Sequence, residues 1–340
     1  MASGRTDPQL VFLTAINVVL LAVGAVAAGG AFVGLDNLQS MAGQVPEIGL
    51  LAIGVMLAMA SGNGGIDLSG IALANLAGVI GATVVSRMIS PEASPLAFSL
   101  AFGAVTILAG IVGGAFNGLL IARLGLAPIL CTLGTQMLFT GVAVVISDAR
   151  AVTVGDAGLL FSLGNDNVLG VPIAFAVFLM AALLVGAMLK FSPFGVRLML
   201  MGTNATAARF AGFGRGRMLL GAYTLSGLMA GLAGVIIAAR NVNVKWDYGQ
   251  SYLLVAILIV VMAGVKPEGG YGRMTCVVLS AIALQLLSSL LNFLNFSNFF
   301  RDFGWGLLLL VFLAAIRFDL VRGVMASVRP PRPATPSAKP

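Results

Sequence analysis

The feature that most constrains this chain is a series of apolar stretches, each close to 20 residues long, separated by short polar gaps. A helix rises about 1.5 Å per residue, so about 20 apolar residues cross the roughly 30 Å hydrocarbon core of a bilayer. Only 9% of the residues are charged, whereas soluble domains are about a quarter charged. The pattern therefore predicts an all-α, polytopic membrane helix bundle.

The hydropathy pattern predicts about ten transmembrane helices, within a range of about eight to ten. The first stretch is too long for a signal-peptide core and lacks a cleavage site, so we expect it to be retained as a span. The predicted spans are 10–33, 46–62, 70–86, 96–122, 128–147, 170–190, 217–239, 252–265, 274–295 and 303–321.

The basic residues between the spans predict how the chain is oriented. The net charge of +7 does not indicate nucleic-acid binding, because the charges lie in the short gaps between apolar runs. Lys and Arg are retained on the cytoplasmic side of a membrane, and the most basic gap is about 191–216. This places both termini in the cytoplasm, with 1–9 as the N-terminus, 10–321 as a single transmembrane domain and 322–340 as a disordered tail. We expect a multi-pass protein of the bacterial plasma (inner) membrane.

Several kinds of chemistry are excluded by the composition. The chain has no histidine, which removes Ser-His-Asp catalysis and histidine metal sites. Cys131 and Cys276 lie within apolar stretches and have no CxxC partner, so we interpret them as small core residues. No phosphate-binding G-x-x-x-x-G-K-[ST] loop is present. We therefore expect neither an enzyme nor a metal or cofactor bound by this chain.

Two glycine-rich breaks interrupt the apolar pattern. The stretch SGNGGIDLSG, 61–70, contains Gly64 and Gly65 ahead of Asp67, and AGVKPEGGYGR, 263–273, contains Gly269 and Gly270. One interpretation is that Asp67 or Ser69 caps the following helix. The other is that broken helices line a central polar path, since irregular backbone at membrane depth needs a cavity or protein around it.

A central path for a solute needs hydrogen-bonding side chains within the spans. Each candidate has a structural alternative, which is a bond between helices that holds the bundle. The chain offers no string of buried carboxylates suited to a proton relay, which argues against ion-coupled transport. The candidates are Asp67, Asn75, Asn117, Thr135, Gln136 and Asn292.

The basic gap has the pattern of a short surface helix. Asn204 is a good helix N-cap, Ala207 and Ala208 are good helix formers, and Gly212 ends the segment. The arginines here, including Arg209, are compatible with two interpretations. The helix either lies on anionic lipid or docks a cytoplasmic partner.

Five motifs in order resemble the permeases of ribose-type ABC sugar importers. The pattern G-x-N-x-x-A-A-x-x-x-G, from Gly202 to Gly212, is similar to the family's cytoplasmic loop. The chain departs from the family after GGIDLS, where Gly70, Ile71 and Ala72 replace the usual Val-Gly-Ser. The other similar blocks are GGIDLSG at 64–70, NGLLIARLGLAPILCTLGT at 117–135, LSGLMAGLAGVIIAAR at 225–240 and GGYGR at 269–273.

This resemblance implies a transport subunit with defined partners. The chain would pair with a second permease, the same or homologous, and translocate a neutral sugar or sugar-like solute. An extracytoplasmic binding protein would deliver the solute through the outer segments 148–168 and 240–252. A separate ATPase would use ATP and dock on the 202–217 loop through Gly202, Asn204, Ala207, Ala208, Arg209 and Gly212. The alternative function is a stand-alone secondary transporter for a small polar solute.

Overall fold

The computed structural model describes residues 8–155 and 157–327. The helices are α1 Pro8–Ala28, α2 Gly30–Val33, α3 Leu35–Ala60, α4 Gly70–Ser86, α5 Pro95–Leu124, α6 Pro128–Ser147, α7 Gly158–Asn165, α8 Ile173–Phe191, α9 Pro193–Thr203, α10 Ala205–Phe210, α11 Arg215–Asn241, α12 Tyr252–Met262, α13 Met274–Phe293 and α14 Asn298–Ser327. The strands are β1 Val152–Thr153, β2 Asn167–Val168, β3 Val171–Pro172 and β4 Asn243–Val244.

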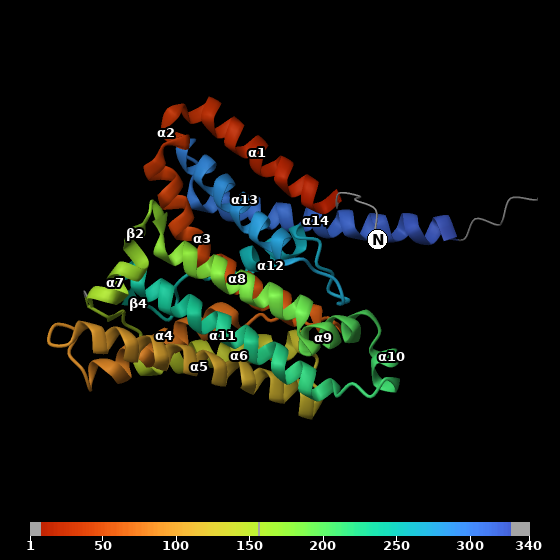
Figure 1. Ribbon diagram of the computed structural model, residues 1–340, viewed down its shortest axis with the longest axis horizontal. Coiled ribbons are helices and arrows are strands. Elements are labelled where there is room, and N and C mark those ends of the chain that lie inside the picture. The colour runs from red at the N-terminus through yellow and green to blue at the C-terminus, as the bar shows by residue number, and fades with distance from the viewer. Residues whose placement is uncertain (1–7, 156, 328–340) are drawn as a thin grey trace, which may run out of the picture.

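Two helices, α3 and α11, form the centre of the bundle. Every residue of α3 from Val45 to Ala60 is buried, because apart from Glu47 this part of the helix is apolar or small on all its faces. It packs against α8, α11, α12 and α13, while α11 also packs against α4 and α5. Figure 1 shows α1, α13 and α14 on one side of these central helices and α4, α5 and α6 on the other. The core is therefore made by helices far apart in the sequence.

The contact between α5 and α11 depends on small residues. A Cβ atom on Gly114 would lie 2.7 Å from Cα of Gly227, and a Cβ on Gly227 would lie 2.7 Å from Cα of Gly114. Helix backbones approach this closely in lipid only where side chains are absent. The close contact fixes the position of α11 against α5, and with it the polar residues that both helices carry.

The two ends of the bundle carry different segments. At one end lie α9 and α10, together with the start of α1 and the end of α14 (Figure 1). At the opposite end lie α7 and β2, and there β1 pairs with β4 in the register Val152↔Val244 and Thr153↔Asn243. This pairing joins the segments 148–168 and 240–252, each of which was predicted to lie outside the membrane.

The predicted all-α membrane bundle is confirmed, since each of the ten predicted spans contains a helix. Within the described residues, seven helices are long and apolar enough to cross a membrane, and α4 and α12 are shorter apolar helices. The seven are α1, α3, α5, α6, α8, α11 and α13.

The predicted boundaries with the largest errors lie in α3 and α14. Helix α3 begins at Leu35 rather than near 46, and it carries Pro46 within it. The added part is polar, and Gln44 there accepts a hydrogen bond from Gln285 of α13, which a hydropathy pattern cannot detect. Helix α14 continues to Ser327, beyond the predicted end at 321. Most of the predicted N-terminal segment and tail, 1–7 and 328–340, lies outside the described residues.

Candidate functional site

Asp67 lies at the centre of a buried hydrogen-bond network where the first glycine-rich break meets the bundle. Its side chain is 2% exposed. Its Oδ1 accepts bonds from the Ser69 backbone N–H at 3.0 Å and the Ser69 hydroxyl at 2.7 Å. Its Oδ2 accepts a bond from the Ser226 hydroxyl of α11 at 2.6 Å. The carboxylate therefore connects the break that precedes α4 to the central helix α11.

The geometry corrects the capping interpretation of this stretch. Ser69 occupies the N-cap position of α4 but makes no side-chain capping bond. Asp67 bonds Ser69 itself rather than an N–H group of the first helical turn. The carboxylate thus fixes the conformation of the turn without satisfying the helix end.

Asn117 of α5 extends the network and leaves part of it unsatisfied. Its Nδ2 donates to the Ser69 hydroxyl at 2.7 Å, and its side chain is fully buried. Its Oδ1 and the hydroxyl of Tyr223 have no hydrogen-bond partner among the described residues. Buried polar groups in proteins nearly always have partners. The network therefore retains hydrogen-bonding capacity that a solute or water can use.

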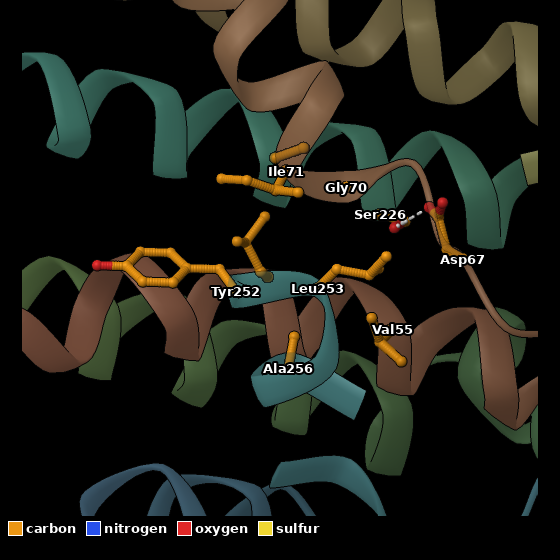
Figure 2. Close-up of a pocket in the computed structure, with 10 residues that line it drawn as sticks. Val55, Asp67, Gly70, Ile71, Ser226, Tyr252, Leu253 and Ala256 are labelled. Atoms are coloured by element: carbon orange, nitrogen blue, oxygen red, sulfur yellow. Dashed lines mark hydrogen bonds between the residues drawn. The ribbon is translucent and has the colours of Figure 1, made fainter. Parts of the chain in front are cut away.

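A small cavity borders this network. Its volume is about 10 Å³, which is room for roughly one water molecule. Figure 2 shows Asp67 and Tyr252 at opposite ends of it, with Ile71, Leu253 and Val55 between them. The described state is therefore closed to a sugar. The lining residues are Leu51, Val55, Asp67, Gly70, Ile71, Ser226, Ala230, Tyr252, Leu253 and Ala256.

A second polar cluster lies beyond the apolar part of this lining. Glu47 of α3 is 1% exposed and forms a salt bridge with Arg240 at the end of α11. Its Oε2 accepts bonds from the hydroxyls of Tyr248 at 2.8 Å and Tyr252 at 3.1 Å. Sequence reasoning missed this cluster, although a lone glutamate at the start of the predicted span 46–62 was a signal that could have found it.

Asn75 of α4 holds the segment that carries Tyr248. Its Nδ2 donates to the backbone oxygens of Trp246 at 3.2 Å and Tyr248 at 2.9 Å, which holds the segment between α11 and α12 against α4.

Burial, and after it the charge of Glu47, raise the pKa of the Tyr248 phenol above its ordinary value. This hydroxyl therefore stays protonated and remains a donor at neutral pH.

Of the six predicted path residues, only Asp67 is among those that line this cavity. Asn75 and Asn117 bond to neighbouring segments, and the other three lie on α6 and α13. Thr135 of α6 is buried, and its hydroxyl donates to the Thr132 oxygen of its own helix. Gln136 follows it on α6 and is not among the lining residues. Asn292 is exposed near the end of α13. From the sequence, all polar side chains within the spans were equal candidates. Which of them come into contact depends on the helix face on which each one lies.

The basic gap folds into two helices, α9 and α10. The side-chain oxygen of Asn204 accepts a bond from the Ala207 N–H at 2.9 Å, so it caps α10 as the sequence predicts. Ala208 is the buried residue of α10, and Gly212 follows the helix with φ +76°. Arg209 is exposed, and the Phe210 side chain is 89% exposed. This end of the bundle therefore presents a basic and aromatic surface.

The glycine-rich breaks meet the basic gap through their backbones. A Cβ atom on Gly62 would lie 2.9 Å from Cα of Gly202. Gly269 and Gly270 also contact Gly202, and the Gly64 N–H donates to the Pro267 oxygen at 3.2 Å. We call Gly62, Gly202, Gly269 and Gly270 the glycine junction. Of the other predicted break residues, Gly64 has a positive φ of 68° and Gly65 does not. The junction links α3, α9 and the segment before α13.

Comparison with known proteins agrees with this architecture. Residues 37–316 match the family described as "Branched-chain amino acid transport system / permease component". The chain belongs to this permease family. The match covers every helix that lines the cavity, whereas α1 and α2 lie before it.

Curated relatives match the permease over most of its length. A ribose import permease protein of Haemophilus influenzae is 28% identical, covering 84% of this chain and 86% of the relative. An L-arabinose transport system permease protein of Escherichia coli is 31% identical, with 83% and 82% covered. A ribose import permease protein of Bacillus subtilis is 30% identical, with 81% and 83% covered. These relatives confirm the predicted resemblance to ribose-type permeases. No solved structure gives a significant match.

Proposed function

We propose that the permease is the membrane-spanning subunit of an ATP-driven importer for a neutral sugar or sugar-like solute. The observation that carries the proposal is the similarity over about four-fifths of the chain to permeases named for ribose and L-arabinose. The side chains around the cavity support it, because hydroxyl, amide and carboxylate groups are the partners that sugar hydroxyls require.

The translocation path would run between α3, α4, α11 and α12. All four helices contribute to the lining of the cavity, from Tyr252 at one end to Asp67 and Ser226 at the other. The apolar side chains between these ends close the path in the described state. Passage of a solute therefore requires the helices to move apart, as in alternating access.

Coupling to a separate ATPase would act through α9 and α10. The exposed Arg209 and Phe210 offer the ATPase a docking surface, and Asn204, Ala207, Ala208 and Gly212 give the docking helix its shape. Displacement of this helix would reach α3 and α13 through the glycine junction. ATP would be bound and hydrolysed on that partner chain.

The remaining partners follow from the two ends of the bundle. We place α9, α10 and both termini in the cytoplasm of a bacterium, and the permease in its inner membrane. The joined segments around β1 and β4 would receive the binding protein at the outer end. A second permease, the same or homologous, would complete the translocation unit.

Reconstitution tests this function. The permease is placed in proteoliposomes with its ATPase and a sugar-loaded binding protein, and uptake of labelled ribose or L-arabinose is measured. We expect uptake only with ATP and all components present. Uptake by the permease alone, driven by an ion gradient, would instead support the secondary-transporter alternative.

The docking role has its own variant. Ala207→Asp places a carboxylate on the exposed face of α10, where it opposes partner docking, so we expect loss of uptake and of stimulated ATP hydrolysis. Ala93→Asp is the matched control, because Ala93 is exposed in the loop between α4 and α5. Normal coupled uptake by Ala207→Asp would remove α10 from the coupling route.

A further inference from the structure

The cluster around Glu47 contains more hydrogen-bond donors than a structural ion pair needs. A charge pair within a membrane protein costs desolvation energy, and an apolar pair of similar volume is often as stable. Here the carboxylate is bound by Arg240 and by two phenols from another segment. Three donors thus converge on one buried carboxylate, and buried ionisable groups in membrane helix bundles usually have a functional role.

The cluster borders both the outside of the bundle and the path. The Arg240 side chain is 25% exposed, and Tyr248 and Tyr252 are half-buried. Tyr252 also lines the cavity that reaches Asp67. On α3, Glu47 and the lining residues Leu51 and Val55 are four residues apart and so share one face of the helix. Glu47 therefore lies about 12 Å along the helix from Val55, on the same face.

The segment that supplies the phenols is held in place at some energetic cost. Val242 ends α11 in the left-handed region with φ 56°, which is rare for a β-branched residue. Such strain persists where the surrounding structure enforces it, often at functional sites. The two Asn75 bonds to this segment supply part of that enforcement. The phenols are thereby positioned before any solute arrives.

The chemistry of the cluster matches a polyhydroxylated solute. A carboxylate accepts hydrogen bonds, an arginine donates them and a phenol does both, so adjacent hydroxyl groups find complementary partners here. The rings of Tyr248 and Tyr252 lie edge to face, 5.8 Å apart, and Trp246, two residues before Tyr248, is half-buried. These aromatic side chains offer apolar surface to the C–H face of a sugar ring.

We propose that Glu47, Arg240, Tyr248 and Tyr252 form an outer binding station for the solute. Adjacent hydroxyl groups of a sugar replace bonds among these four side chains before the solute passes the constriction formed by Leu51, Ile71 and Leu253. The station gives the permease a selectivity of its own, additional to that of the binding protein. This inference rests on the proposed function as a sugar importer.

The test compares two sugars in the complete reconstituted transporter. Uptake of ribose and of 2-deoxyribose is measured at saturating concentrations of the same binding protein for every variant. Since one binding protein delivers both sugars, a change in the ratio of the two uptake rates reports the permease. Tyr248→Phe and Tyr252→Phe keep the ring and remove one hydroxyl each. We expect each to lower the ribose preference by about two- to tenfold, the effect of one hydrogen bond.

The control for these variants is a tyrosine outside the cluster. Tyr271→Phe removes an exposed hydroxyl outside the cluster and should leave the ratio unchanged. If both cluster variants and Glu47→Gln keep the wild-type ratio while importing ribose normally, the binding station is refuted and the sugar importer stands. If the wild-type transporter imports leucine and neither sugar, the proposed function itself is wrong.

Discussion

At the scale of single residues, the two buried carboxylates Glu47 and Asp67 are held by different kinds of donor. Glu47 is neutralised by Arg240 and has two further donors. Asp67 is satisfied by hydroxyls and one backbone N–H, all of them neutral donors. A carboxylate held by neutral donors can exchange one of them for a solute hydroxyl without breaking an ion pair.

Asp67→Asn should reduce uptake. The amide is isosteric with the carboxylate, but one of its two polar atoms becomes a donor, so it cannot accept from both Ser69 and Ser226 as before. Uptake in proteoliposomes measures the loss, and detergent solubility with a single gel-filtration peak shows that the protein is folded. Asp247→Asn, at an exposed acid, is the control. Unchanged uptake in Asp67→Asn would leave this side chain a steric role only.

Arg240→Ala should destabilise the fold. It leaves the Glu47 carboxylate buried without its cation, and breaking such a pair costs about 3 kcal/mol. The apparent melting temperature in detergent measures the change. The double variant Arg240→Ala with Glu47→Gln removes the uncompensated charge and should recover part of the loss. Equal stability of the single and double variants would contradict the importance of the charge.

At the scale of elements, the sequence predicted the positions of the helices better than the contacts between them. Apolar length locates a span because lipid demands it, and each predicted span contains a helix. Asp67 and Asn117 were predicted as path residues and do share a network. Glu47, Tyr248 and Tyr252 were not predicted, because they meet across about 200 positions of chain. No local pattern of hydropathy reports such a distant contact.

The glycine junction is the element-scale feature that suits coupling. We expect Gly202→Ala to impair uptake, because an added Cβ would overlap the Ala60 oxygen and the Gly270 nitrogen. The measurement is the number of sugars imported per ATP hydrolysed, which falls when loop movement no longer reaches α3. Gly216→Ala is the control, since its Cβ would lie 3.8 Å from the nearest atom. A normal ratio in Gly202→Ala would mean that coupling bypasses the junction.

At the scale of the whole molecule, the bundle has two chemically different ends. One carries α9 and α10 with exposed arginines, and the other carries the β1–β4 pair and the β2–β3 hairpin. The positive-inside rule predicts that the first end lies in the cytoplasm. The predicted orientation of the whole chain therefore depends on the arginines at the α9 and α10 end, which can be read directly from the sequence.

Cysteine labelling tests this orientation. Thr206→Cys in α10 and Leu169→Cys in the β2–β3 hairpin both place a thiol at an exposed position. A membrane-impermeant maleimide added to intact cells stripped of the outer membrane should label Leu169→Cys alone. The natural Cys131 and Cys276 are buried, so the background is low. Labelling of Thr206→Cys from outside would invert the topology and end the docking role of α10.

The near absence of space between Tyr252 and Asp67 has a consequence for the cell that houses this protein. A route wide enough for a sugar is also wide enough for protons and small ions, which would discharge the potential across the membrane. Because bulky aliphatic side chains fill the space between Tyr252 and Asp67 in the described state, protons and small ions find no open route there and the membrane potential is preserved.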